Sequence, residues 1–260
     1  MRLAHPAYGQ LRAVTDTASV LLCDNPGLLT LEGTNTWILR ASGSDEFVVV
    51  DPGPDDAAHI ERIAALGKVA LVLISHRHGD HTDGIDKLVD LTGATVRSVG
   101  SGFLRGLGGP LTDGEVIEAA GLRITVLATP GHTADSVSFL LDDAVLTADT
   151  VLGRGTTVID DEDGSLRDYL ESLRRLAGLG ARTVLPGHGP DLPDIRDVAA
   201  MYLAHRQERL DQVRDALREL GQYAGARRIV EHVYTDVDEK LWDAAEKSVQ
   251  AQLDYLMSTD

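Results

Sequence analysis

Short runs of apolar and β-branched residues alternate with amphipathic segments over residues 1–193. Runs of this kind, bounded by turn-forming residues, predict buried strands, and apolar positions three or four residues apart predict helices. The predicted strands are residues 17–22, 36–40, 47–50, 69–74, 95–99, 122–127, 137–141, 144–147 and 183–185. The predicted helices are residues 55–66, 84–92 and 166–179. The alternation indicates one large α/β domain.

From residue 194 onward the pattern is helical only, over residues 195–220, 226–234 and 239–256. Gly221 and Gly225 interrupt it, as expected between helices. We therefore predict two domains: residues 1–193, with mixed strands and helices, and residues 194–260, a small helical domain.

One face of the first C-terminal helix carries Tyr202, His205, Arg206 and Arg209, which lie at i, i+3, i+4 and i+7. Two interpretations are open. The face is a solvated polar stripe with its arginines paired to nearby acids, or it closes over a catalytic cleft and binds an anionic group of the substrate.

The composition narrows the classes of partner. The net charge of −17 opposes long-range attraction of a polyanion, and residues 196–260 carry nine Lys and Arg against thirteen Asp and Glu. We therefore expect no stable nucleic-acid partner.

The single cysteine, Cys23, excludes an intramolecular disulfide, and no apolar stretch reaches the roughly 20 residues that span a bilayer. These features predict a cytoplasmic protein without a membrane partner.

Candidate chemistry is concentrated in His76-Arg77-His78-Gly79-Asp80-His81, directly after the predicted strand 69–74. This segment holds three of the nine histidines of the chain. Imidazoles at i and i+2 in a loop can turn toward one ion, and Asp80 and His81 can reach a second ion beside it. The alternative is a solvated turn that happens to be rich in histidine.

Three later segments supply further donors, each at the end of a predicted strand. His132 follows Pro130-Gly131, Asp149 follows strand 144–147, and His188 follows Pro186-Gly187. A lone histidine after Pro-Gly is more often a turn residue than a ligand. With the first cluster, however, the donors total seven nitrogen- or oxygen-bearing side chains, which suits two ions that share an aspartate.

The pattern His-x-His-x-Asp-His, followed by separate His, Asp and His, resembles that of the metallo-β-lactamase-fold hydrolases over residues 15–190. The resemblance implies an α/β fold, the αββα sandwich of two face-to-face mixed sheets with helices outside. It places His76, His78 and His132 on metal 1 and Asp80, His81 and His188 on metal 2, with Asp149 bridging both ions.

Asp51, in Val50-Asp51-Pro52-Gly53, resembles the first-motif aspartate of the same superfamily. The resemblance implies that its carboxylate orients a ligand histidine. An ordinary Asp-Pro-Gly turn is the alternative.

A closer resemblance, to the β-lactamase-like protein 2 family, rests on several further motifs. They are Asn25-Pro26-Gly27, residues 31–37 and 153–157, residues 185–190 and the helix segment 202–209. The best-described member of that family is a mitochondrial endoribonuclease acting on single-stranded RNA. Two departures stand out: the C-terminal helical domain looks winged-helix-like but without a wing, which weakens the inference of nucleic-acid binding, and Asp83-Gly84 stands where many relatives carry Gly-Gly.

Imidazole and carboxylate ligands favour two Zn²⁺ ions, although Mn²⁺ and Fe²⁺ accept the same donors. Ions about 4 Å apart would lower the pKa of a bridging water from about 16 toward 7 and so supply hydroxide at neutral pH. By analogy with the superfamily, Asp80 orients that hydroxide and is the predicted catalytic residue. We also hold Thr34, Asn35, Thr156 and Thr157 as candidate substrate contacts, beside the helix face at Tyr202, His205, Arg206 and Arg209.

The chain is therefore predicted to be a binuclear metal-dependent hydrolase. The leading specific function is a phosphodiesterase or endoribonuclease on single-stranded RNA. The alternative is a thioesterase or glyoxalase II-like hydrolase of an anionic small-molecule ester or thioester. A third class, a diiron electron-transfer module, would use the same ligands but needs a flavin partner, and no flavin-binding domain is recognisable in this chain.

Overall fold

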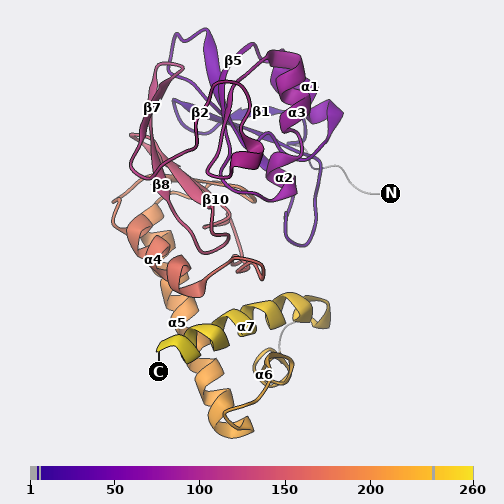
Figure 1. Cartoon of the computed structure of the whole chain (residues 1–260), viewed down its shortest axis with the longest axis vertical. Helices are drawn as coiled ribbons and strands as arrows, with labels where there is room; N and C mark the ends of the chain where they lie inside the picture. Colours follow the sequence, from indigo (N-terminus) through magenta and orange to yellow (C-terminus); the bar gives the residue numbers. More distant parts are fainter. Residues whose placement is uncertain (1–4, 6, 236–237, 260) are drawn as a thin grey trace.

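The computed structural model describes residues 5, 7–235 and 238–259. Two β-sheets lie face to face, with helices α1 and α3 on one side and helix α4 on the other, and the C-terminal helices extend beyond α4 (Figure 1). The first sheet has the strand order β1-β2-β3-β4-β5-β6 and the second β11-β10-β9-β8-β7. Both sheets mix parallel and antiparallel pairs, so the predicted αββα sandwich is confirmed.

The first sheet contains the strands β1 Leu11–Ala13, β2 Ala18–Leu22, β3 Asn35–Leu39, β4 Glu46–Val50, β5 Lys68–Leu73 and β6 Val96–Arg97. The second contains β7 Val116–Ala119, β8 Leu122–Ala128, β9 Val137–Leu140, β10 Ala144–Ala148 and β11 Thr183–Pro186. The predictions missed β1 and β7, because both are short edge strands with exposed positions instead of a continuous apolar run.

Three apolar layers hold the sandwich together. Alternate residues of the two sheets, such as Trp37 and Val48 facing Ile124 and Phe139, form the layer between the sheets. The opposite face of the first sheet packs on the helices α1 Ala57–Ala65 and α3 Ile85–Thr92. The second sheet packs on α4 Leu166–Ala177, where Val145 and Leu173 belong to one buried cluster. Burial on both faces explains why the central strands read as continuous apolar runs.

The remaining helices are α2 Gly79–Thr82, α5 Ile195–Leu220, α6 Ala226–Val233 and α7 Trp242–Thr259, with a 3₁₀ turn at Glu239–Leu241. After β11 the described residues form no further strand. The apolar cluster under α4 continues through α5 to Val249 and Leu256 of α7. Helix α5 begins after its N-cap Asp194, and the apolar core continues across this point, so the division at residues 193/194 stays a prediction. None of the helices in the described part of the chain has the length and apolar character needed to cross a bilayer.

Helix α1 carries a buried histidine that makes a testable contribution to stability. Asp56 caps the helix by accepting a hydrogen bond from the His59 backbone N–H. The Thr36 hydroxyl donates to the Asp51 carbonyl, so the His59 Nε2–H donates to Thr36 Oγ1, at 2.8 Å. Burial lowers the pKa of His59 from 6.5 to about 4. The imidazole is therefore neutral in the folded protein at neutral pH.

As the pH falls below 6.5, the unfolded chain binds a proton at His59 that the folded protein does not, so stability decreases until the pH reaches about 4. The full loss corresponds to about 3 kcal/mol at 1.36 kcal/mol per pKa unit. We expect H59Q to unfold more easily at pH 7 but to show a shallower pH dependence between pH 4 and 6.5. Urea unfolding across this range measures the slope, and H232Q, at an exposed histidine of α6, is the control. An unchanged slope in H59Q would contradict this account.

Candidate metal centre

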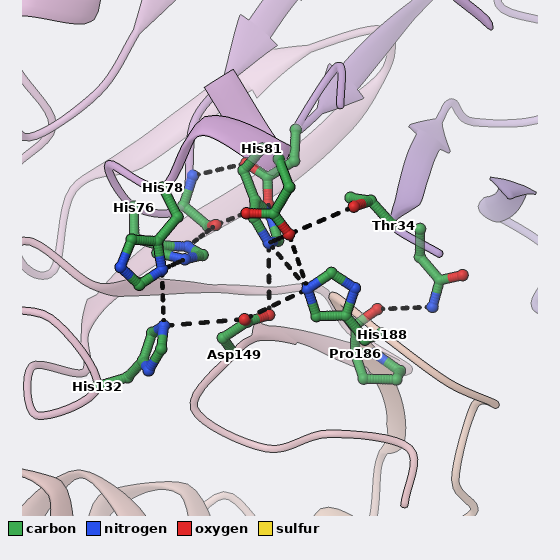
Figure 2. Close-up of polar contacts among 12 residues, drawn as sticks. Thr34, His76, His78, His81, His132, Asp149, Pro186 and His188 are labelled. Carbon is green, nitrogen blue, oxygen red and sulfur yellow. Dashed lines mark hydrogen bonds and ion pairs between the residues drawn. The ribbon is translucent and has the colours of Figure 1, made fainter. Parts of the chain in front are cut away.

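All seven predicted ligands meet at one edge of the sandwich, because each follows the carboxyl end of a strand. His76 and His78 follow β5, and Asp80 and His81 come next in the sequence, in the single turn of α2. The others follow β8, β10 and β11. Figure 2 shows His132 beside His76 and His78, and His81 beside His188, with the Asp149 carboxylate between the two groups. The donor atoms of each group of three lie within 4.8 Å of one another, and so do those of His76, His81 and Asp149.

The first group is His76, His78 and His132. In each ring of the cluster we call the nitrogen that faces the other donors the inner nitrogen and the opposite one the outer nitrogen. The inner nitrogens of this group lie close together. His78 Nδ1 lies 3.1 Å from His76 Nε2 and 3.0 Å from His132 Nε2. Each outer nitrogen has an oxygen partner. His78 Nε2 lies 2.8 Å from Asp160 Oδ2 and His132 Nδ1 lies 2.7 Å from the Val158 carbonyl. His76 Nδ1 lies 2.9 Å from Ser75 Oγ, whose own proton goes to the Asp51 carboxylate.

These partners assign the tautomers of the first group. An imidazole that donates from its outer nitrogen has a lone pair on the inner one. Burial keeps the pKa of His76 well below its usual value, and burial also lowers the pKa of His132. In the neutral tautomers that these partners assign, the inner nitrogens of the three rings direct their lone pairs toward one another. A cation placed among them would remove this repulsion.

The second group is Asp80, His81 and His188. His188 Nε2 lies 3.1 Å from Asp80 Oδ2 and 3.3 Å from His81 Nε2. The outer nitrogens again face oxygens: His81 Nδ1 lies 2.9 Å from Asp51 Oδ2, and His188 Nδ1 lies 3.1 Å from the Gly33 carbonyl. Burial opposes protonation of His188, but the carboxylates of Asp149 and Asp80 raise its pKa well above the usual value. A proton here takes the place that a metal ion would fill, and metal binding would release it.

Asp149 lies between the two groups. Its Oδ2 is 3.4 Å from His188 Nε2 and 3.8 Å from His132 Nε2. Burial would raise the pKa of this carboxyl, but His188 and His81 hold it well below the usual range, so the group is ionised. Its Oδ1 is buried without a hydrogen-bond partner in the described part of the chain. A Cβ on Gly187 would approach this oxygen to 2.4 Å, so glycine keeps the space beside it open.

Two non-glycine residues at the centre have left-handed backbone conformations. Asp51 has φ 55° and Ala148, just before Asp149, has φ 44°. Such conformations cost of order 1–3 kcal/mol each and persist where the surroundings enforce them. The strained backbone of Asp51 directs its carboxylate to both the Ser75 N–H and His81. The Asp-Pro-Gly segment is thus more than a turn, because its carboxylate holds the ring of His81.

The donor set fits two divalent ions. Five imidazoles, each held by an oxygen at its outer nitrogen, converge with two carboxylates. One of these, Asp149, has a buried oxygen that makes no hydrogen bond in the described part of the chain and lies 3.5 Å from His81 Nε2. Outer-nitrogen hydrogen bonds of this kind are the usual support of metal-binding histidines. Asp80 and His78 are the most exposed members, with side chains 28 % and 27 % accessible, so the cluster opens to solvent on their side.

Of the candidate substrate contacts at the start of β3 and in the loop after β10, Thr34, Asn35 and Thr157 already make hydrogen bonds within the protein. The Asn25 side chain donates to Thr34 Oγ1, which lies 3.5 Å from Asp80 Oδ2. The Asn35 amide donates to the carbonyls of Pro186 and Gly189, on either side of His188. Buried Thr157 donates to the Asp149 carbonyl, whereas Thr156 is exposed.

The helix face of α5 is also engaged within the protein. The Tyr202 hydroxyl contacts the Leu152 N–H and carbonyl, both at 3.1 Å. The buried Arg206 guanidinium donates to the Thr157 carbonyl and lies over the Tyr169 ring. Arg209 lies over the Tyr234 ring and donates to Gln212, and His205 is partly buried. These contacts differ from those of a solvated stripe, and they use Tyr202 and Arg206 to hold the loop after Asp149.

Sequence reasoning did not identify Ser75, Asp160 or the carbonyls of Val158 and Gly33 as partners of the ligands. Ser75 could have been suspected, because it immediately precedes His76 in the motif. Asp160 lies 82 residues from His78 along the chain, and only the tertiary structure brings them together.

Family models match two parts of the chain. The metallo-β-lactamase superfamily model covers residues 29–188, and the model of the β-lactamase-associated winged helix domain covers residues 226–260. The second match supports the winged-helix-like description of the C-terminal helices.

Comparison with individual proteins points to the same superfamily. A β-lactamase-like protein 2 homolog of Caenorhabditis elegans is 30% identical over 241 residues, which are 87% of this chain and 79% of the relative. An atrochrysone carboxyl ACP thioesterase of Aspergillus fumigatus is 33% identical over 215 residues, which are 77% of this chain and 64% of the length of that relative. A metallo-β-lactamase family protein of Thermus thermophilus superimposes with a TM-score of 0.78 at 25% identity, covering 95% of each chain. The resemblance inferred from the motifs is confirmed: this chain belongs to the metallo-β-lactamase superfamily of hydrolases.

Proposed function

We propose that the protein is a binuclear, zinc-dependent hydrolase whose substrate is a small carboxylic thioester. The observation that supports metal dependence is the convergence of five oriented imidazoles on Asp149 and Asp80. Two zinc ions held there would supply Lewis acidity and water activated at neutral pH. Mn²⁺ and Fe²⁺ fit the same nitrogen and oxygen donors, so metal analysis of the purified protein has to identify the ion.

The side chains of the chain itself have separate tasks in this proposal. Asp80 is the partly exposed carboxylate of the cluster and is ionised, because His188 and His81 outweigh the effect of burial and lower its pKa. It accepts a hydrogen bond from the attacking water on the open side. Asp51 and Asp160 hold the rings of His81 and His78 through the outer nitrogens. No serine or cysteine nucleophile is required.

A thioester is favoured over RNA by three observations. The similar Aspergillus fumigatus protein is named a thioesterase. The negative net charge opposes association with a polyanion, and Arg206, the buried cation of α5, is bound to a backbone carbonyl. Because its single cysteine cannot form an intramolecular disulfide, we propose that the protein works in the reducing cytoplasm.

The second candidate is a phosphodiesterase or endoribonuclease acting on single-stranded RNA. It is favoured by the similarity to the β-lactamase-like protein 2 homolog and by the winged-helix match over residues 226–260. The same ligand cluster serves a phosphodiester equally well.

A hydrolysis panel on the zinc-loaded protein distinguishes the candidates. It contains S-lactoylglutathione, an acyl-CoA, a single-stranded RNA, bis-p-nitrophenyl phosphate and a cephalosporin. We expect the highest kcat/KM on a thioester and complete loss of that activity with chelator. RNA cleavage that weakens steeply with salt, without thioester hydrolysis, would favour the second candidate, because phosphate contacts release counterions. No hydrolysis of any member by fully metallated protein would overturn the proposed function.

A further inference from the structure

The loop after β10 contacts both the candidate metal centre and the C-terminal helices. We call residues 150–163 the support segment. We propose that Tyr202 and Arg206 of α5 are positioning residues that set the affinity of metal site 1, acting through the support segment. The inference rests on the metal-binding part of the proposed function but on no particular substrate.

The support segment provides the outer partners of two of the three histidines in site 1. The Val158 carbonyl accepts from His132 Nδ1 at 2.7 Å, and Asp160 Oδ2 accepts from His78 Nε2 at 2.8 Å. The Asp160 backbone N–H also donates to the His132 carbonyl at 3.0 Å. Since the outer hydrogen bond fixes both the tautomer and the orientation of a ligand ring, the inner lone pairs of His78 and His132 point wherever the segment holds them.

The segment has no internal regularity that would hold it in place. Between Thr150 and Asp163 the described backbone forms neither helix nor strand. Its fixed points include contacts with neighbouring helices: the Tyr169 hydroxyl of α4 donates to the Thr150 carbonyl at 2.7 Å, and Tyr202 contacts Leu152 through both its N–H and its carbonyl. At its far end Asp160 is also paired with Arg77, at 2.9 Å. A loop of this kind keeps its geometry only as well as such contacts define it.

Arg206 holds the segment next to the ligand partners. Its guanidinium donates to the Thr157 carbonyl, one residue before Val158, and its centre lies 5.0 Å from the Tyr169 ring centroid. The side chain is only 4% exposed. A buried guanidinium over an aromatic ring, with a charge-assisted hydrogen bond to a carbonyl, defines the position of that carbonyl more strictly than an exposed contact would. At the outer end of the segment, Lys247 of α7 pairs with Asp161 at 2.9 Å.

The support segment provides no outer partner for the histidines of site 2. It contacts His188 through the backbone, where the Gly153 N–H donates to the His188 carbonyl at 2.9 Å. His81 is held by Asp51, after β4, and His188 by the Gly33 carbonyl, before β3. The third histidine of site 1, His76, is held by its neighbour Ser75. Loosening the support segment therefore releases the rings of His78 and His132 but not those of His81 and His188. This asymmetry separates a positioning role from a general effect on folding.

The test measures zinc affinity in proteins with one site each. H188A removes a ligand of site 2 and leaves site 1 complete, and H132A does the reverse. In the H188A background we expect R206Q and Y202F each to raise the zinc dissociation constant about tenfold, and D160A by roughly 10- to 100-fold, the usual effect of removing a partner of a ligand histidine. In the H132A background the same changes should leave the zinc dissociation constant within about twofold of the value for H132A alone. Competition with a chromophoric chelator measures both, and the circular dichroism spectrum checks the fold.

Conservative and distant variants complete the test. R206K can still donate to the Thr157 carbonyl and should recover part of the affinity that R206Q loses. R214Q removes an arginine on α5 that pairs with Asp211 at the surface, and should change neither site. Y202F removes only the hydroxyl and keeps the aromatic ring in the core. Its site 1 affinity therefore tests the proposal even if R206Q does not fold. Unchanged site 1 affinity in folded Y202F, or equal losses at both sites, would overturn the proposal. These readouts need no substrate, so the proposal stands or falls separately from the hydrolysis panel.

Discussion

Alanine at His132 is expected to remove metal 1 and alanine at His188 to remove metal 2, with hydrolysis falling by two orders of magnitude or more in each case. Each residue supplies an inner nitrogen to only one of the two groups, whereas Asp149 lies between them. An ion that both activates water and stabilises developing charge contributes several kcal/mol, which corresponds to roughly a hundredfold or more in rate. Elemental analysis should give about two ions per chain for the native protein and about one for each variant, as for other binuclear sites.

The matched control is H232Q, which removes an exposed histidine of α6 far from the cluster in the sequence. It should keep both ions and full activity. A metal-supplemented, folded native protein without bound transition metal would contradict the assignment of both sites.

Substitution of Asp80 by alanine is expected to lower turnover at least a hundredfold while the ion of site 1 stays bound. Asp80 is the most accessible carboxylate of the cluster, and it lies 3.1 Å from His188 Nε2, so it can both complete site 2 and receive a proton from the attacking water. Loss of a group that serves the chemical step should lower kcat and kcat/KM together. Steady-state kinetics at saturating zinc, with metal analysis of the same sample, separates this effect from simple loss of metal.

Asp83 offers a control in the same turn. It is an exposed residue directly after α2, three residues from Asp80, and its backbone N–H caps the turn by donating to the Gly79 carbonyl. D83A should therefore retain activity within about twofold, as is usual for surface substitutions. If D80A retained comparable activity, the catalytic role of Asp80 would be refuted, and the carboxylate would be only a structural member of the turn.

The sequence alone determined the superfamily of the protein, and it predicted the seven candidate donors that the structure brings together. Buried strands such as β5 and β10 were predictable because burial on both faces requires an unbroken apolar run, and α5 was predicted with its observed bounds. The ligands were predictable because the first four lie within one turn of chain and the rest each follow such a strand. Local pattern is sufficient where the determining interactions are themselves local.

The tertiary structure decided how those donors are oriented. The outer partner of His78 is Asp160 and that of His188 is the Gly33 carbonyl, and no spacing or composition connects residues so far apart in the chain. A backbone carbonyl, moreover, has no signature in the sequence. The polar face of α5 shows the same limit: its helical spacing correctly grouped Tyr202 with Arg206, but only packing shows that they hold the support segment. Helix periodicity determines which side chains share a face, whereas the partner of that face depends on long-range packing of the whole chain.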